Sequence, residues 1–323
     1  MRRRISLAEW YRGPIIPPVT DGNDRRGSGD VQTRRVGFLA YVSCIRYQDV
    51  LILQGSPLLG AAFAVHAFTL ETAARGAVFV LASMLLVAHI FSFNDWAGIA
   101  LDSNDPNKSA AVFVTRGLDR RHVAALSLGL LVASLLLFAL LRRQTLLLGV
   151  AIAALGALYS HPTLNAKGIP VVSSLPHLIG GALHFLLGYS LFGAIDGRAI
   201  LIGLFFALTF TAGHLNQEVR DYDGDRLNGI RTNAVAFGKT AAFAAGGLLF
   251  TLAYADLFFL AWAGLVPAAL ALLPSVLYPL HVVWSITTWR AGLSFANVSR
   301  FQNRYRMLYA LIGLAILASL FAR

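Results

Sequence analysis

Long apolar stretches recur along almost the whole chain, and they constrain its fold more than any other feature. A helix that crosses a bilayer needs about 20 mostly apolar residues. Charged residues make up only 13% of the 323 residues, about half the usual share in soluble domains. The sequence therefore predicts an all-α integral membrane protein. Nine spans are expected, near residues 48–69, 76–96, 122–141, 144–160, 171–193, 198–217, 240–261, 264–287 and 307–322.

The Lys and Arg residues are distributed unequally between the two ends of these spans. With the N-terminus in the cytoplasm, 22 of the 27 fall in cytoplasmic segments. Cytoplasmic loops of membrane proteins carry such an excess of positive charge. We therefore attribute the net charge of +11 to membrane topology and expect no nucleic-acid partner. We expect a location in a bacterial plasma membrane.

Residues 1–45 precede the first apolar stretch and form a separate segment in this interpretation. They are rich in arginine and contain no apolar run that would serve as a secretory signal. We interpret them as a basic, partly mobile cytoplasmic tail. Residues 46–323 form the single transmembrane domain.

A short acidic segment, Asp221-Tyr-Asp-Gly-Asp225, follows the sixth predicted span. Its outer carboxylates are four residues apart, so on a helix they share one face and repel each other unless a cation intervenes. Mg²⁺ prefers oxygen ligands and commonly joins one or two carboxylates to substrate phosphate oxygens. Nearby cations could bind further phosphate oxygens: Arg220, Arg226 and Arg231. The alternative is a solvated, salt-bridged loop.

A second acidic segment runs from Asn94 to Lys108, after the second predicted span. Asn94 and Asp102 are eight residues apart and share a helix face, where both could bind the metal. Asp95 points about 100° away and could orient water or a basic partner. Lys108, at the end of this segment, is expected to bind the diphosphate group of a substrate. The alternative is a polar cap that ends the span.

The third segment lies after the fourth predicted span, where two prolines and a glycine impose an irregular path. Lys167 could act as a point charge on a diphosphate, and Tyr159 could donate a hydrogen bond or face a cationic intermediate. An interfacial Tyr with a snorkelling Lys is the alternative. His161 and His214 are near this face, either as acid–base groups or as helix-packing residues.

Taken in their order along the chain, the three segments resemble the UbiA superfamily of intramembrane prenyltransferases. The resemblance covers most of residues 46–322. The superfamily's first motif, Asn-Asp-x-x-Asp-x-x-x-Asp, is matched by Asn94, Asp95 and Asp102, and its second, Asp-x-x-x-Asp, by Asp221 and Asp225. Its middle loop is matched by Tyr159 and Lys167, and a basic residue near its first helix by Arg46. Gly98 replaces the central Asp of the first motif, and Asp95, Asp102 or Asp105 could substitute for it.

The resemblance implies nine helices around a central cavity, with both acidic motifs at its cytoplasmic mouth. It implies transfer of a prenyl group from an isoprenoid diphosphate to a lipophilic acceptor, which we expect to be an aromatic quinone precursor. Mg²⁺ would be held by Asn94, Asp102, Asp221 and Asp225. The diphosphate would be held by Arg46, Lys108, Lys167, Arg220, Arg226 and Arg231, with Asp95, Tyr159 and Lys167 as catalytic residues.

Two alternative functions remain open at this point. A terpene cyclase of the same superfamily would ionise the same donor but quench the cation within the prenyl chain, so it needs no acceptor. A non-catalytic membrane protein or transporter would also place acidic residues in a membrane cavity. The oligomeric state does not follow from the sequence.

Overall fold

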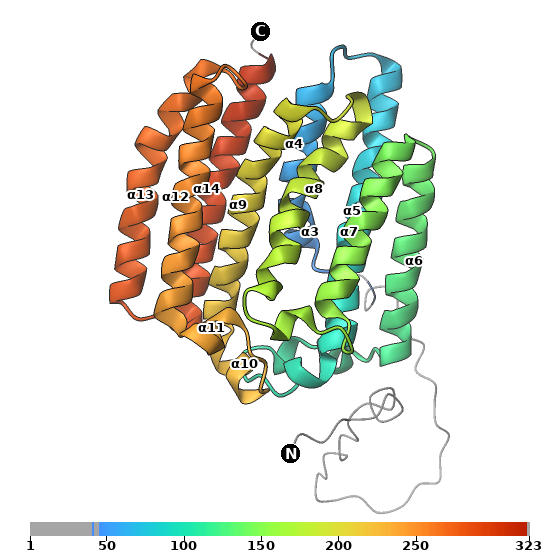
Figure 1. Cartoon of the computed structure of the whole chain (residues 1–323). Helices are drawn as coiled ribbons and strands as arrows, with labels where there is room; N and C mark the ends of the chain where they lie inside the picture. Colours follow the sequence, from blue (N-terminus) through green and yellow to red (C-terminus); the bar gives the residue numbers. More distant parts are fainter. Residues whose placement is uncertain (1–40, 42–44, 322–323) are drawn as a thin grey trace, which may run out of the picture.

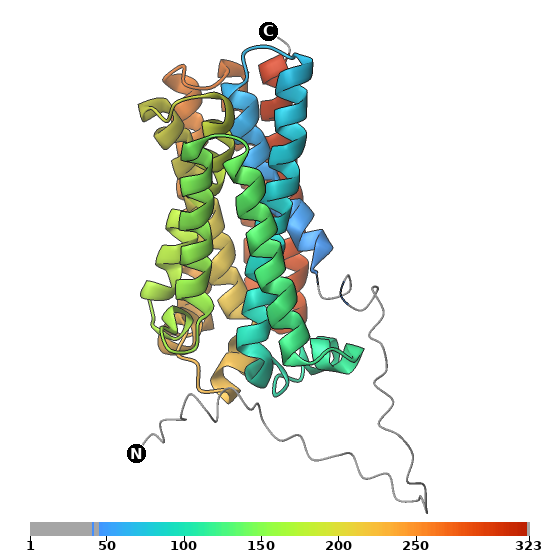
Figure 2. The same ribbon diagram turned by 90° about the vertical axis from the view of Figure 1, so that its right-hand side faces the viewer.

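The computed structural model describes residue 41 and residues 45–321. Every regular element among these residues is a helix. The proposed cytoplasmic tail therefore lies almost entirely outside the described residues and stays a prediction. The long helices form an elongated bundle, shown from two sides in Figures 1 and 2. Their bounds are α5 Leu70–Asp102, α6 Arg120–Ala139, α7 Arg143–Ser160, α8 Leu175–Phe192, α9 Gly197–Arg220, α12 Lys239–Trp262, α13 Leu272–Arg290 and α14 Phe295–Phe321.

Eight helical segments are long and apolar enough to cross a membrane. They correspond to the second to ninth predicted spans, so the prediction of an all-α integral membrane protein is confirmed. The difference in number comes from the first predicted span, which consists of two short helices, α3 (Tyr47–Leu53) and α4 (Gly55–Ala64). Pro57 explains the interruption, because its ring clashes with the carbonyl four residues earlier, at Leu53, where α3 ends.

Two helices extend well beyond the predicted spans. The 33-residue α5 is about 50 Å long at 1.5 Å per residue, whereas a bilayer core is about 30 Å thick. It is therefore longer than a bilayer core, and its last turns carry the polar residues Asn94, Asp95 and Asp102. Helix α14 begins at Phe295, twelve residues before the predicted span. Hydropathy locates the apolar centre of a helix but misses its polar ends.

The helices in the middle of the bundle pack closely because small residues lie at their crossings. Gly60 of α4 and Gly188 of α8 face each other's helix backbone, and a Cβ atom at Gly188 would come within 3 Å of the Pro57 carbonyl oxygen. Small residues at such crossings let backbones approach and gain dispersion contacts in a membrane. This contact fixes the position of α8, which also packs against α7 and α9.

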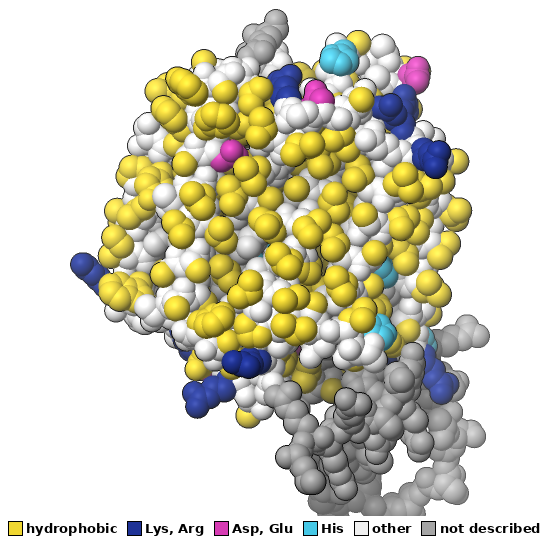
Figure 3. Space-filling view, in the orientation of Figure 1, with side chains coloured by type: hydrophobic (Ala, Val, Ile, Leu, Met, Phe, Trp, Pro, Cys, Tyr) yellow, Lys and Arg dark blue, Asp and Glu magenta, His cyan; other side chains and the backbone are white. Residues whose placement is uncertain are grey.

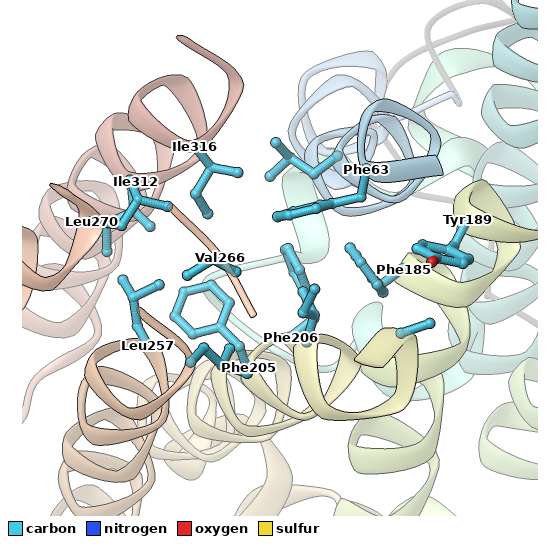
Figure 4. Packing of buried hydrophobic residues seen from close by; sticks show 14 of the residues in the cluster. Phe63, Phe185, Tyr189, Phe205, Phe206, Leu257, Val266, Leu270, Ile312 and Ile316 are labelled. Atoms are coloured by element: carbon cyan, nitrogen blue, oxygen red, sulfur yellow. The ribbon is translucent and has the colours of Figure 1, made fainter. Parts of the chain in front are cut away.

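A continuous apolar core fills the end of the bundle that lies away from α10 and α11. Its large side chains come from α4, α8, α9, α12 and α14 and from the segment between α12 and α13, and they interdigitate (Figure 4). The members labelled there are Phe63, Phe185, Tyr189, Phe205, Phe206, Leu257, Val266, Leu270, Ile312 and Ile316. On the face seen in Figure 3, hydrophobic side chains cover the surface between two ends that carry most of the charge. This arrangement suits a bundle whose surroundings are lipid.

Candidate active site

The two acidic segments meet at one end of the bundle, the lower end in Figure 1. The first comprises the last turns of α5 and the loop after it, and the second runs from the end of α9 into the short helix α10 (Tyr222–Leu227). The Asp225 N–H donates to the Asp221 carbonyl at 2.9 Å, so these residues are one helical turn apart, as predicted. A second short helix, α11 (Asn233–Phe237), follows α10. The bundle thus brings together segments more than 100 positions apart in the sequence.

Two contacts dock the first segment onto α10. The buried Asp105 carboxylate accepts a hydrogen bond from the Asn107 N–H at 2.9 Å and lies directly against Gly224. A Cβ atom at position 224 would overlap that carboxylate, so the close approach requires glycine. The Asn228 side chain donates to the Leu101 carbonyl at 2.9 Å. These contacts fix the end of α5 relative to α10.

Asp221 is held between two cations. Lys108 Nζ donates to Asp221 Oδ2 at 2.9 Å, and Arg220 donates to both carboxylate oxygens, at 2.7 and 3.1 Å. Burial alone would raise the pKa of Asp221, but the hydrogen bonds and charges of Arg220 and Lys108 outweigh it and lower that pKa to about 2. The pKa of Lys108 is raised, because Asp221 outweighs the effect of burial. These three groups are therefore charged at neutral pH.

Asp225 has a different environment from Asp221. It is buried, and its nearest cation is Lys167, whose Nζ lies 3.7 Å from Asp225 Oδ1. Burial raises the pKa of Asp225 to about 6, and Lys167 offsets this only in part. A second positive charge near this carboxylate would therefore be strongly stabilising. The middle loop thus places Lys167 at the second acidic segment. The sequence predicted a diphosphate-binding role for Lys167 but not its contact with Asp225.

The start of the first motif is connected to other helices. Asn94 accepts a hydrogen bond from the Ser160 hydroxyl at 3.1 Å, through its carbonyl oxygen. Asp95 forms a two-point ion pair with Arg46, whose guanidinium also lies over the Phe91 ring. The pair supports the prediction that Asp95 orients a basic partner. It also places Arg46 at the N-terminal end of α3, beside α5.

Tyr159 lies on the apolar side of this charged cluster. Its ring packs edge-on against His177 at 4.8 Å and His214 at 6.0 Å, and the two imidazole rings stack at 3.7 Å. His214 Nε2 lies 3.1 Å from the buried Glu218 carboxylate. The aromatic group therefore adjoins the polar end of the bundle, where a substrate's hydrocarbon part would begin. A helix-packing role remains the simpler account of the two histidines.

Some predicted residues lie apart from the central cluster. Arg226 and Arg231 are exposed. Arg231 lines a cavity of about 270 Å³ between the middle loop and the chain after α10, together with Asn165 and Gly168. A diphosphate-binding role for these two arginines stays a prediction. The structure brings together Lys108, Lys167, Arg220, Asp102, Asp221 and Asp225.

The buried Glu218 was not among the predicted site residues, yet it connects three elements. It accepts hydrogen bonds from the Ser173 hydroxyl at 3.0 Å and from the Asn233 backbone and side chain at 2.9 and 3.2 Å. Its only sequence signal is a carboxylate at the end of an apolar span. Asn228 and Gln302, which accepts a hydrogen bond from Arg220 at 3.0 Å, were also not assigned to the site, and Asp105 was considered only as a substitute for the missing first-motif Asp. Their roles depend on contacts with residues that are distant in the sequence, so the sequence alone gives no signal for them.

The oxygen donors suit Mg²⁺ only in part. Within residues 41 and 45–321, no three His, Cys, Asp or Glu side chains form a preassembled metal site. Mg²⁺ usually retains waters and needs only one or two carboxylates besides substrate phosphates. Asp225 meets that requirement, since it is buried beside a single lysine. The first motif fits less well, because Gly98 supplies no ligand.

Comparison with known proteins finds a curated protein with a similar sequence and several solved structures with a similar fold. A curated lycopene elongase/hydratase of Haloferax volcanii is 29% identical over 69% of this chain and 72% of its own length. A solved UbiA homolog from Archaeoglobus fulgidus, bound to DMAPP and Mg²⁺, superposes with a TM-score of 0.69 at 19% identity, covering 88% of this chain and 98% of that one. An apo UbiA homolog from Aeropyrum pernix superposes with a TM-score of 0.64 at 19% identity, covering 86% and 97%.

The family itself is established by a match to most of the chain. The model of the UbiA prenyltransferase family matches residues 55–320, from the start of α4 to the end of α14. The match includes both acidic segments and the middle loop, so the resemblance inferred from these motifs is confirmed. The chain belongs to the UbiA prenyltransferase family.

Proposed function

We propose that the protein transfers a prenyl group from an isoprenoid diphosphate to a lipophilic acceptor. One observation carries this proposal: Lys108, Lys167 and Arg220 meet the carboxylates Asp221 and Asp225 at one end of an apolar bundle. An isoprenoid diphosphate has the same division, with a charged head and a hydrocarbon tail. The tail would lie among the helices while the diphosphate stays at the charged end.

Mg²⁺ is the proposed cofactor. Asp225 and Asp221 would hold it together with diphosphate oxygens, with Asn94 and Asp102 as candidate ligands from α5. When bound, the ion would neutralise charge on the leaving diphosphate. The A. fulgidus homolog, described as bound to DMAPP and Mg²⁺, supports both the cofactor and the class of donor.

The residues of the chain have distinct roles in this proposal. The allylic carbon–oxygen bond breaks heterolytically, and its electron pair leaves with the diphosphate, whose charge Lys167 and Arg220 stabilise. The Tyr159 ring faces the allylic cation, and the apolar helices exclude water. The acceptor's π electrons then form the new carbon–carbon bond, and the resulting cation loses a proton.

The acceptor divides the proposal into two versions. An aromatic quinone precursor is the version expected from the sequence. The H. volcanii relative, named lycopene elongase/hydratase, favours a long polyene hydrocarbon instead. The cyclase alternative needs no acceptor. We further propose that the end with α10 and α11 faces the cytoplasm of a bacterial cell, since the positive charge of the loops is concentrated there.

Diphosphate release by the purified protein in liposomes tests the function. The assay would use dimethylallyl and geranyl diphosphates with Mg²⁺, and either lycopene, an aromatic quinone precursor or no acceptor. We expect release that depends on an acceptor. Release without any acceptor would favour cyclisation, and no release with any donor would favour a non-catalytic role.

A matched pair of variants ties the activity to the site. Asp225→Asn removes the buried carboxylate proposed to hold the metal, and we expect release to fall at least about 100-fold. Asp223→Asn removes a carboxylate two residues away that is exposed and paired with Lys239. Its activity should remain near that of the unmodified protein. Equal activity of the two variants would contradict the proposed site.

A further inference from the structure

Lys108 occupies a central position between the two acidic segments. It lies in the loop after α5, and its Nζ atom is 2.9 Å from Asp221 Oδ2, 3.8 Å from Asp102 Oδ1 and 3.8 Å from Asp105 Oδ2. An ammonium group has three N–H donors and no acceptor. Three carboxylates from both segments therefore surround one positive charge.

The first motif lacks a carboxylate at position 98, beside Asp102, which is one of the groups that face this lysine. An ideal Cβ atom built on Gly98 would lie 3.4 Å from Asp102 Oδ2, so a side chain at position 98 would point toward the group that faces Lys108. The chain has therefore lost one negative charge where Lys108 supplies a positive one. A divalent ion held there would need that missing oxygen ligand.

The remaining acidic groups divide into two sets by their partners. Asp221 already accepts hydrogen bonds from Lys108 and Arg220 at both oxygens, whereas the nearest described cation to Asp225 is Lys167, at 3.7 Å, with Lys108 acting on it from farther away. Asp225 is thus the carboxylate most available to a metal ion. Asp102 and Asp105 share the positive charge of Lys108, each at 3.8 Å.

We propose that Lys108 is a built-in cation that takes the place of a divalent metal ion between the two acidic segments. This inference rests on the proposed function, because it concerns how the same diphosphate site is charged. The geometry assigns metal binding to Asp225 together with diphosphate oxygens, and it assigns Asp102 and Asp221, two of the candidate ligands named above, to Lys108. It also assigns Lys108 to the carboxylates of the protein, in place of the diphosphate-binding role predicted from the sequence.

Metal binding without any diphosphate tests this assignment directly. The experiment uses full-length protein in detergent and Mn²⁺ as a spectroscopic probe, followed by electron paramagnetic resonance. The unmodified protein should bind Mn²⁺ weakly. Lys108→Met leaves three carboxylates without their shared cation, and we expect it to bind Mn²⁺ at least tenfold more tightly. Lys108→Arg keeps the charge and should behave like the unmodified protein.

Lys239→Met is the matched control, because it removes a cation from the exposed Asp223 nearby. It should leave Mn²⁺ affinity unchanged. Equal affinities of Lys108→Met and the unmodified protein would overturn the proposal, as would tight binding by the unmodified protein.

A second measurement, thermal unfolding with and without Mg²⁺, tests the proposal even if Lys108→Met is less stable than the unmodified protein. Mg²⁺ should then raise the unfolding temperature of Lys108→Met and leave that of Lys239→Met unchanged. A destabilised Lys108→Met that Mg²⁺ does not restore would show a merely structural lysine and overturn the proposal. Both readouts are independent of turnover. A failure of the unmodified protein to release diphosphate would therefore count against the proposed function and not against this role of Lys108.

Discussion

Gly224 lies so close to Asp105 that a Cβ atom at position 224 would come within 3 Å of Asp105 Oδ2. This contact joins the loop after α5 to α10. We expect Gly224→Ala to destabilise the protein by about 1–3 kcal/mol, because the added methyl group forces the two segments apart. Diphosphate release should fall as well, since Lys108 and Asp102 would move away from Asp221.

Thermal unfolding and diphosphate release of Gly224→Ala would check this expectation. Gly247→Ala, in the middle of α12, is the control, since no heavy atom lies within 4 Å of its ideal Cβ position. It should be as stable as the unmodified protein. Equal stability of both variants would show that the loop and α10 separate without cost.

The ion pair between Arg46 and Asp95 predicts energetic coupling between α3 and α5. The side chains are 43% and 21% exposed, so solvent weakens the interaction. In a double-mutant cycle with Arg46→Met and Asp95→Asn, we expect a coupling of about 1 kcal/mol in the free energy of unfolding. Strictly additive effects would mean that the two residues act independently.

The buried Glu218 predicts a large difference between two substitutions. Glu218→Ala removes the acceptor of the Ser173 hydroxyl and of the Asn233 backbone N–H, at a cost of about 1–3 kcal/mol for each buried group. Glu218→Gln keeps one oxygen acceptor and should lose much less stability. Denaturant unfolding in detergent would compare them. A Gln variant as unstable as the Ala variant would indicate that the negative charge matters more than the hydrogen bonds.

The crossing of α4 and α8 predicts a position-specific effect of adding one methyl group. Gly188→Ala should lower the unfolding temperature, because its Cβ atom would overlap the Pro57 carbonyl oxygen. Gly180→Ala changes the same helix where no heavy atom lies within 4 Å. That variant should be as stable as the unmodified protein or slightly more stable. The unfolding temperatures of the two variants would be measured in the same detergent. Equal temperatures would contradict the prediction.

Much of the fold could be predicted because its signals are local. The spans depend on runs of apolar residues, and eight of them reappear as single helices. The break between α3 and α4 was missed, although Pro57 is visible in the sequence, because the average hydropathy of a stretch does not register one missing hydrogen bond. The polar ends of α5 and α14 were missed because hydropathy detects only the apolar part of a helix.

The candidate site was predictable as residue types and not as contacts. The spacing of Asp221 and Asp225 placed them one turn apart, which the structure bears out. The partner of each charge did not follow from spacing. Lys108 was expected to bind a substrate, yet it lies among Asp102, Asp105 and Asp221. Glu218 was not assigned to the site, although it connects three elements.

The sequence by itself determined the membrane class, the number of long helices to within one, and the chemical types at the charged end. These features depend on composition and on spacings of a few residues. In a helix, such a spacing determines which side chains share a face. Only the tertiary structure decided which charges meet. Lys108 and Asp221 are 113 positions apart, and their contact exists because helix packing, with Gly224 against Asp105, brings the ends of α5 and α9 together.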